Sequence, residues 1–142
     1  MSQFVGRWRA EEVSGQVRGY AEFIAVSDVP VNVQEMVKGK FAILELSRQG
    51  NTWMSKSSLE GMPVRIHEFQ LGQEVESERI DGTIQNFTNT IEGDTWIEEI
   101  KPVSDPSGNS TLTKRTVSGD VMDVNVTILG QGASMSFRML RL

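Results

Sequence analysis

Apolar and polar residues alternate along most of this chain, a pattern typical of short β-strands. After residue 40 the alternating runs are separated by clusters of Gly, Asn, Asp, Ser and Pro. Such a series predicts a meander of antiparallel strands, which forms a sandwich or an up-and-down barrel. We favour the barrel because its closure removes exposed sheet edges. Strands are expected at Phe4–Arg9, Phe41–Leu46, Thr52–Leu59, Val64–Gln70, Arg79–Thr90, Asp94–Val103, Ser110–Val117, Val121–Leu129 and Ala133–Leu142.

One stretch between the first two strands has the helical period instead. The first helix is indicated by apolar residues spaced at i, i+3, i+4 and i+7, namely Val17, Tyr20, Ala21 and Ile24. A second helix is expected to begin at Asp28, which can cap it, and to end at Gly39. Its apolar set is Val29, Val33, Met36 and Val37. The two helices, joined at Val26 and Ser27, would form a helical hairpin.

Two strands predict what the interior contains. Val121–Leu129 is one-sided, with valines and an isoleucine on one face and polar residues on the other. Thr52–Leu59 places Ser55 and Ser57 on the same face as Trp53. If that face points inward, the barrel encloses hydroxyl groups. A ligand-bearing cavity with ordered water satisfies such groups better than a tightly packed core does.

The last strand leaves two orientations open for its arginine. Alternation puts Met135, Phe137 and Met139 on one face and Arg138 and Leu140 on the other. Alternation alone sends the apolar set inward and leaves Arg138 in water, because an unpaired arginine is almost never fully buried. The alternative is that Arg138 faces a cavity, where a bound carboxylate would pair with its guanidinium.

Composition and charge narrow the class of protein. The 142 residues suit a single domain spanning residues 1–142, and 38% hydrophobic with 23% charged residues argues against disorder. A net charge of -5 with scattered Lys and Arg argues against nucleic-acid binding. The absence of cysteine excludes disulfides and thiolate metal sites. No apolar run approaches a membrane span, and no basic region precedes an apolar block at the N-terminus, so a cytoplasmic location is expected.

Three motifs, in order, resemble the intracellular lipid-binding proteins, the family of fatty-acid-binding and cellular retinoid-binding proteins. Phe4-Val5-Gly6-Arg7-Trp8-Arg9 matches the opening F-x-G-x-W-[KR], and the predicted hairpin follows it. Phe69-Gln70-Leu71-Gly72-Gln73-Glu74-Val75 resembles F-x-L-G-x-E-F, with Val75 replacing the aromatic. Arg138-Met139-Leu140 stands where the family has R-x-[YF]. The resemblance therefore spans the whole chain.

The resemblance implies an all-β fold, a ten-stranded antiparallel up-and-down β-barrel of the lipocalin-like kind, with a helix-turn-helix lid. It also implies a carboxylate ligand held by two arginines and a tyrosine, which map onto Arg115, Arg138 and Leu140. Leu140 has no hydroxyl, and losing a hydrogen bond to a charged group costs about 1.5–3 kcal/mol unless water replaces it. The other ligand-contacting residues expected are Trp53, Ser55, Ser57, Tyr20, Val33 and Met36.

The function expected from this resemblance is a non-catalytic, monomeric carrier of a long-chain fatty acid or similar hydrophobic carboxylate. A retinoic-acid-like or other bulky hydrophobic ligand is the alternative within binding proteins. From a different class, a haem or small-molecule β-barrel enzyme would use His67, the single histidine. No cofactor or metal site is expected, since no second ligand is spaced for one. Lys38 and Lys40 offer a basic spot for transient contact with an anionic membrane.

Overall fold

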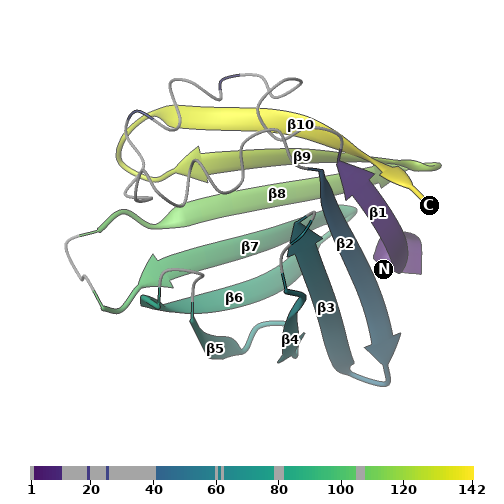
Figure 1. Ribbon diagram of the computed structural model, residues 1–142, viewed down its shortest axis with the longest axis horizontal. Helices are drawn as coiled ribbons and strands as arrows, with labels where there is room; N and C mark the ends of the chain where they lie inside the picture. The colour runs from purple at the N-terminus through teal and green to yellow at the C-terminus, as the bar shows by residue number, and fades with distance from the viewer. Residues whose placement is uncertain are drawn as a thin grey trace.

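The computed structural model describes residues 2–10, 19, 25, 41–59, 61, 63–78, 82–104 and 108–142. Within these ranges, ten antiparallel strands form one sheet that curls into a nearly closed barrel (Figure 1). The elements are η1 (Ser2–Phe4), β1 (Gly6–Ala10), β2 (Ala42–Gln49), β3 (Thr52–Leu59), β4 (Arg65–Phe69), β5 (Glu74–Glu78), β6 (Ile84–Glu92), β7 (Thr95–Pro102), β8 (Thr111–Ser118), β9 (Val121–Ile128) and β10 (Ala133–Arg141). The predicted barrel is confirmed.

Neighbours in the sheet are neighbours in the chain, except that β1 joins β2 to β10. β1 pairs with β2 and also with β10, so Trp8 lies opposite both Leu44 and Arg141. The two edges are β4 and β5, and in the described part of the chain no strand pairs with either outer edge. On β5 the exposed positions are all glutamates, namely Glu74, Glu76 and Glu78.

Aromatic side chains from distant strands fill the interior beside the N-terminal turn. Phe4 of η1 packs edge-on against Trp96, with ring centroids 5.4 Å apart. Trp96 also lies 5.4 Å from Trp53, which stacks on Phe69. Burying each such side chain contributes roughly 1.5–3 kcal/mol. Because η1, β3, β4 and β7 all contribute, this cluster ties segments together that are far apart in the sequence.

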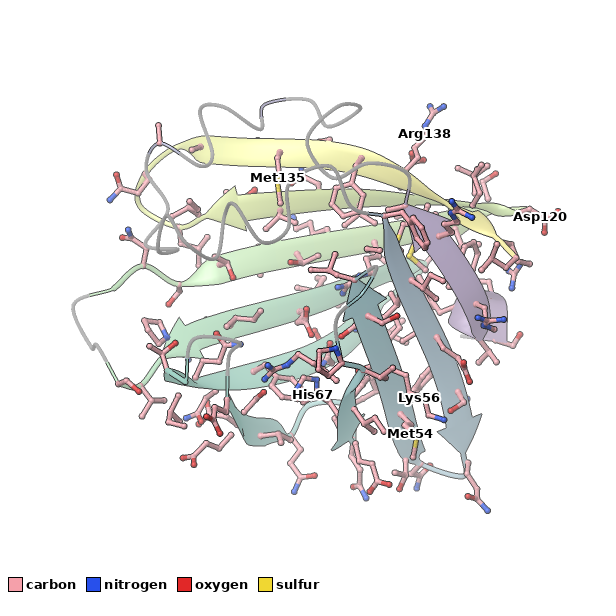
Figure 2. The ribbon with its side chains drawn as sticks, in the orientation of Figure 1. Met54, Lys56, His67, Asp120, Met135 and Arg138 are labelled. Carbon is pink, nitrogen blue, oxygen red and sulfur yellow. The ribbon has the colours of Figure 1, made fainter. Side chains whose placement is uncertain are left out.

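The faces of β10 follow its alternation. Register pairs Met139 with Met122 and Arg138 with Asp123. Met139 is buried, whereas Arg138 projects away from the barrel and donates from Nε to Asp123 Oδ1 at 3.1 Å (Figure 2). The Arg138 side chain is 69% exposed. The alternation-based prediction is therefore correct, and the inward orientation implied by the resemblance is wrong.

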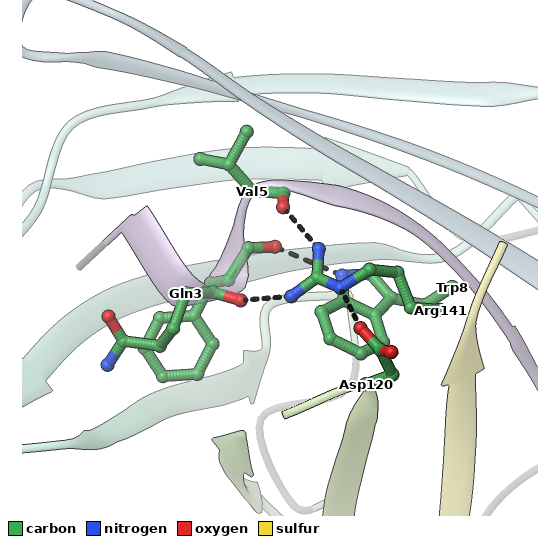
Figure 3. Close-up of polar contacts among 6 residues, drawn as sticks. Gln3, Val5, Trp8, Asp120 and Arg141 are labelled. Carbon is green, nitrogen blue, oxygen red and sulfur yellow. Dashed lines mark hydrogen bonds and ion pairs between the residues drawn. The ribbon is translucent and has the colours of Figure 1, made fainter. Parts of the chain in front are cut away.

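Arg141 fastens the end of β10 to the start of the chain (Figure 3). Its guanidinium donates to the backbone oxygens of Val5 and Gln3 at 2.9 and 3.1 Å, and Nε donates to Asp120 Oδ1 at 3.1 Å. The guanidinium carbon also lies 4.2 Å from the centroid of the Trp8 ring. We call these contacts the Arg141 clamp. The clamp joins η1 and β1 to the last strand.

Gly6 is required beside the Arg141 clamp for two reasons. Its φ of 140° lies in a region that residues with a side chain rarely adopt. A Cβ at this position would lie 2.6 Å from Nη1 of Arg141. The glycine of the opening motif thus provides room for the guanidinium.

The predicted elements differ from the observed ones chiefly at the start of the chain and around β5. Phe4 belongs to a 3-10 turn rather than to the first strand. The strand expected at Arg79–Thr90 corresponds to β6, which begins later, at Ile84 after Gly82 with its φ of 85°, and ends at Glu92. β5 was not predicted. Thr52–Leu59 matches β3 at both ends.

The predicted helical hairpin lies outside the described residues, apart from Gly19 and Ala25. Among the described residues, no helix has the length and apolar character needed to cross a lipid bilayer.

Candidate ligand-binding cavity

A cavity of about 180 Å³ lies inside the barrel, and we call it the inner cavity. Its polar lining consists of Ser55, Ser57, His67, Ser77, Gln85, Glu98 and Arg115. Its apolar lining consists of Leu44, Leu46, Phe69, Phe87, Trp96 and Ile100. These residues occupy alternate positions of their strands, so the pleat alone turns them to one face. The inner cavity therefore offers both hydrogen-bonding groups and apolar surface.

An ion pair crosses from β7 to β8 in this cavity. Nη2 of Arg115 lies 3.3 Å from Oε1 of Glu98, and the two side chains are only 16% and 22% exposed. The guanidinium also lies 5.5 Å from the centroid of the Trp96 ring, whose Nε1 donates to Asn89 Oδ1 at 2.7 Å. Because both side chains are mostly buried, water screens this ion pair less than it screens an exposed one. Glu98 thus compensates the positive charge of Arg115.

His67 and Ser77 link the two edge strands across the open side of the sheet. The Ser77 hydroxyl lies 2.7 Å from Nε2 of His67, and the imidazole packs edge-on against Phe87 at 5.2 Å. Burial lowers the pKa of His67 below its usual 6.5, Arg65 lowers the pKa further, and Glu98 opposes both effects. The imidazole is therefore neutral at neutral pH and can either donate to or accept from a polar group.

A second pocket of about 210 Å³, which we call the outer pocket, adjoins the first. Its lining is mostly apolar and comprises Ala42, Ile43, Leu44, Ser57, Ser58, Leu59, Pro63 and Arg65. Leu44 and Ser57 line both spaces. The polar inner cavity and the apolar outer pocket are thus neighbours.

The structure places the residues expected from the sequence in three groups. Ser55, Ser57 and Arg115 line the inner cavity, and Trp53 is buried in the aromatic cluster beside it. Arg138 and Leu140 lie on the outer face, where Leu140 is 52% exposed, so neither lines the cavity. The remaining three, Tyr20, Val33 and Met36, lie outside the described residues.

Several cavity residues were not recognised from the sequence, above all Glu98. Glu98 is adjacent to Glu99, and alternation sends the two carboxylates to opposite faces. A signal was present, since Glu98 shares its strand face with Trp96 and Ile100, which are both apolar. The outward Glu99 instead faces Lys101 at 3.7 Å.

Comparison with known proteins establishes the fold. No protein-family model matches the chain, and no curated protein sequence does. Secretory abundant heat soluble protein 4 from Ramazzottius varieornatus superimposes with a TM-score of 0.88 at 18% identity, covering 100% of this chain and 96% of that one. Echinococcus granulosus fatty-acid-binding protein 1 gives a TM-score of 0.84 at 17% identity, covering 100% of this chain and 99% of that protein. The chain has the fold of the fatty-acid-binding proteins. A Schistosoma mansoni fatty acid binding protein in complex with arachidonic acid gives a TM-score of 0.84 at 18% identity, covering 100% of this chain and 98% of that protein.

Proposed function

We propose that this protein is a non-catalytic carrier that binds a lipid inside its barrel. The observation that carries the proposal is the polar inner cavity adjoining the apolar outer pocket, with Leu44 and Ser57 common to both. An amphiphile needs this arrangement, with hydrogen-bonding partners at one end and apolar surface at the other. Two proteins of the same fold are named as fatty-acid-binding proteins, and one of them holds arachidonic acid.

The volumes of the inner cavity and the outer pocket support a ligand that occupies both of them. Pockets for small molecules usually measure roughly 300–1,000 Å³, and the inner cavity alone is smaller than that. A head group in the inner cavity with a tail in the outer pocket uses the two volumes together. Each buried methylene of the tail contributes about 0.8 kcal/mol, so the tail supplies most of the affinity. A long-chain fatty acid or related lipid has the required shape.

Titration with Nile red, an uncharged fluorescent lipid probe, tests the proposal directly. Wild-type protein should enhance its fluorescence, and unlabelled lipid should reverse the increase. Ser57→Phe fills the junction of the two spaces and should abolish the signal. Ser47→Phe, on an exposed position of β2, is the matched control and should bind as wild type does. Equal binding by both variants, or none by the wild type, would refute the proposal.

An enzyme using His67 is the second candidate, and the 2.7 Å contact with Ser77 is the observation that favours it. A hydrolytic triad also needs an acid that orients the histidine. Among the described residues, no carboxylate forms a hydrogen bond with this ring. The carrier is therefore the function that the geometry supports better, and an esterase assay with wild type and His67→Gln distinguishes the two.

A further inference from the structure

The charges lining the inner cavity already cancel one another. Arg115 carries one positive charge and Glu98 one negative charge, separated by 3.3 Å. His67, the third titratable group of the lining, is held neutral mainly by burial. Arg65 lines the adjoining outer pocket, and its charge acts on His67. The charges of the inner-cavity lining itself sum to zero at neutral pH.

A fatty acid carboxylate would disturb this balance. To reach Arg115 it must displace Glu98 or share the guanidinium with it, and either arrangement leaves a net negative charge in a space screened poorly by water. Displacing Glu98 would also leave its carboxylate without its cation, in a side chain that is only 22% exposed. The arginine that would anchor an acid is therefore already occupied.

The remaining polar lining suits a different head group. Hydroxyls of Ser55, Ser57 and Ser77 and the amide of Gln85 can each donate and accept hydrogen bonds. An alcohol, amide or ester presents donors, acceptors or both without adding charge.

We infer that the inner cavity selects lipids with an uncharged polar head group over those with an ionised carboxylate, because Glu98 neutralises Arg115. This inference rests on the proposed lipid-binding function and specifies its ligand class. Glu98 acts as the residue that determines specificity. Removing its charge while keeping its shape frees the guanidinium for a carboxylate.

Displacement of Nile red by three lipids with the same tail tests the inference. Oleic acid, oleyl alcohol and oleamide are titrated against the full-length protein at neutral pH. For the wild type, the alcohol and the amide should displace the probe at concentrations about tenfold lower than the acid, the scale set by one hydrogen bond to a charged group. Glu98→Gln should strengthen binding of oleic acid by about tenfold and change that of the two neutral lipids by much less.

Two further variants test whether the charge of Glu98, acting on Arg115, causes the preference for uncharged lipids. Glu99→Gln removes a neighbouring charge on the outer face and should leave the wild-type preference intact. Glu98→Gln/Arg115→Gln removes both charges, so the gain for oleic acid should disappear. The double variant also controls for unfolding, because Glu98→Gln alone leaves the charge of Arg115 without its partner, whereas the double variant leaves no unpaired charge.

Three outcomes would overturn the inference. The first is a wild type that binds oleic acid at least as tightly as the two neutral lipids, or a Glu98→Gln variant that shows no gain for oleic acid. The second is a double variant that binds oleic acid as tightly as Glu98→Gln does, because the gain would then not depend on Arg115. In both cases lipid binding itself stands. The third is a wild type that binds neither Nile red nor any of the three lipids, and only this outcome also refutes the proposed function.

Discussion

Replacing Arg141 with methionine should destabilise the barrel strongly, although the residue lies at the very end of the last strand. Methionine keeps an apolar stem over Trp8 but removes every donor of the Arg141 clamp. Two bonds to backbone oxygens are lost, those to Val5 and Gln3. The contact with the Trp8 face at 4.2 Å is lost as well.

The magnitude follows from these contacts. Hydrogen bonds that involve a charged group are worth about 1.5–3 kcal/mol each, and the lower end applies at a site only partly buried. A cation over an aromatic face adds about 0.5–1 kcal/mol at an exposed site. The pair with Asp120 adds little, because that carboxylate side chain is 83% exposed. We therefore expect a loss of about 3–4 kcal/mol in the free energy of unfolding, or roughly 10 °C in midpoint for a domain of this size.

Urea unfolding followed by tryptophan fluorescence measures this loss, with Asp120→Asn and Arg138→Met as controls. Asp120→Asn removes the exposed partner alone, and Arg138→Met removes an arginine that is 69% exposed on the same strand. Each control should change the free energy of unfolding by less than about 1 kcal/mol. A loss below about 1 kcal/mol for Arg141→Met, or an equal loss for Asp120→Asn, would show that the backbone contacts are not the source of the stability.

Three other predictions concern single residues. Arg138→Ala should leave the displacement of Nile red by all three oleyl lipids unchanged, because its side chain lies outside the barrel; weaker binding of the acid alone would contradict this orientation. His67, whose folded-state pKa lies below the usual 6.5, binds protons more readily in the unfolded chain, so stability should fall as pH drops below about 6.5. His67→Gln should flatten that slope in urea titrations between neutral and mildly acidic pH, and parallel slopes would contradict it. Gly6→Ala should lower the free energy of unfolding by about 1–3 kcal/mol through backbone strain and displacement of Arg141. Combined with Arg141→Met its effect should be less than additive in thermal unfolding, and full additivity would show that the two positions are independent.

Local patterns in the sequence were sufficient to predict much of the fold. Flanking turn residues were enough to locate β3, and period two placed Ser55 and Ser57 on the face of Trp53, which the structure turns inward. β5 was missed because its sequence, Glu-Val-Glu-Ser-Glu, contains one apolar residue and therefore lacks the hydrophobic signal of a buried strand face. The strand exists because β6 pairs with it along its whole length. That pairing is a tertiary effect, which a local pattern does not contain.

The candidate site was predicted less completely, for a related reason. Arg115 was found by resemblance, but Arg138 was placed on the wrong face, since a shift of one residue in a strand reverses every side chain. Arg138 lies opposite Asp123 of β9 and donates to its carboxylate on the outer face of the sheet. Glu98 was overlooked because its importance depends on the diagonal neighbour Arg115 on the next strand. Which side chains meet across strands is set by register, and register emerges only when the sheet is assembled.

The glutamates of β5 also bear on how copies of this protein behave at high concentration. An edge strand exposes unpaired backbone groups, and a second molecule can extend the sheet by adding its own edge there. Two copies that met at β5 would bring Glu74, Glu76 and Glu78 of one against the same residues of the other. Like charges directly opposite each other oppose strand pairing. The acidic sequence that makes β5 hard to predict thus also opposes the pairing of two β5 edges between copies of the protein.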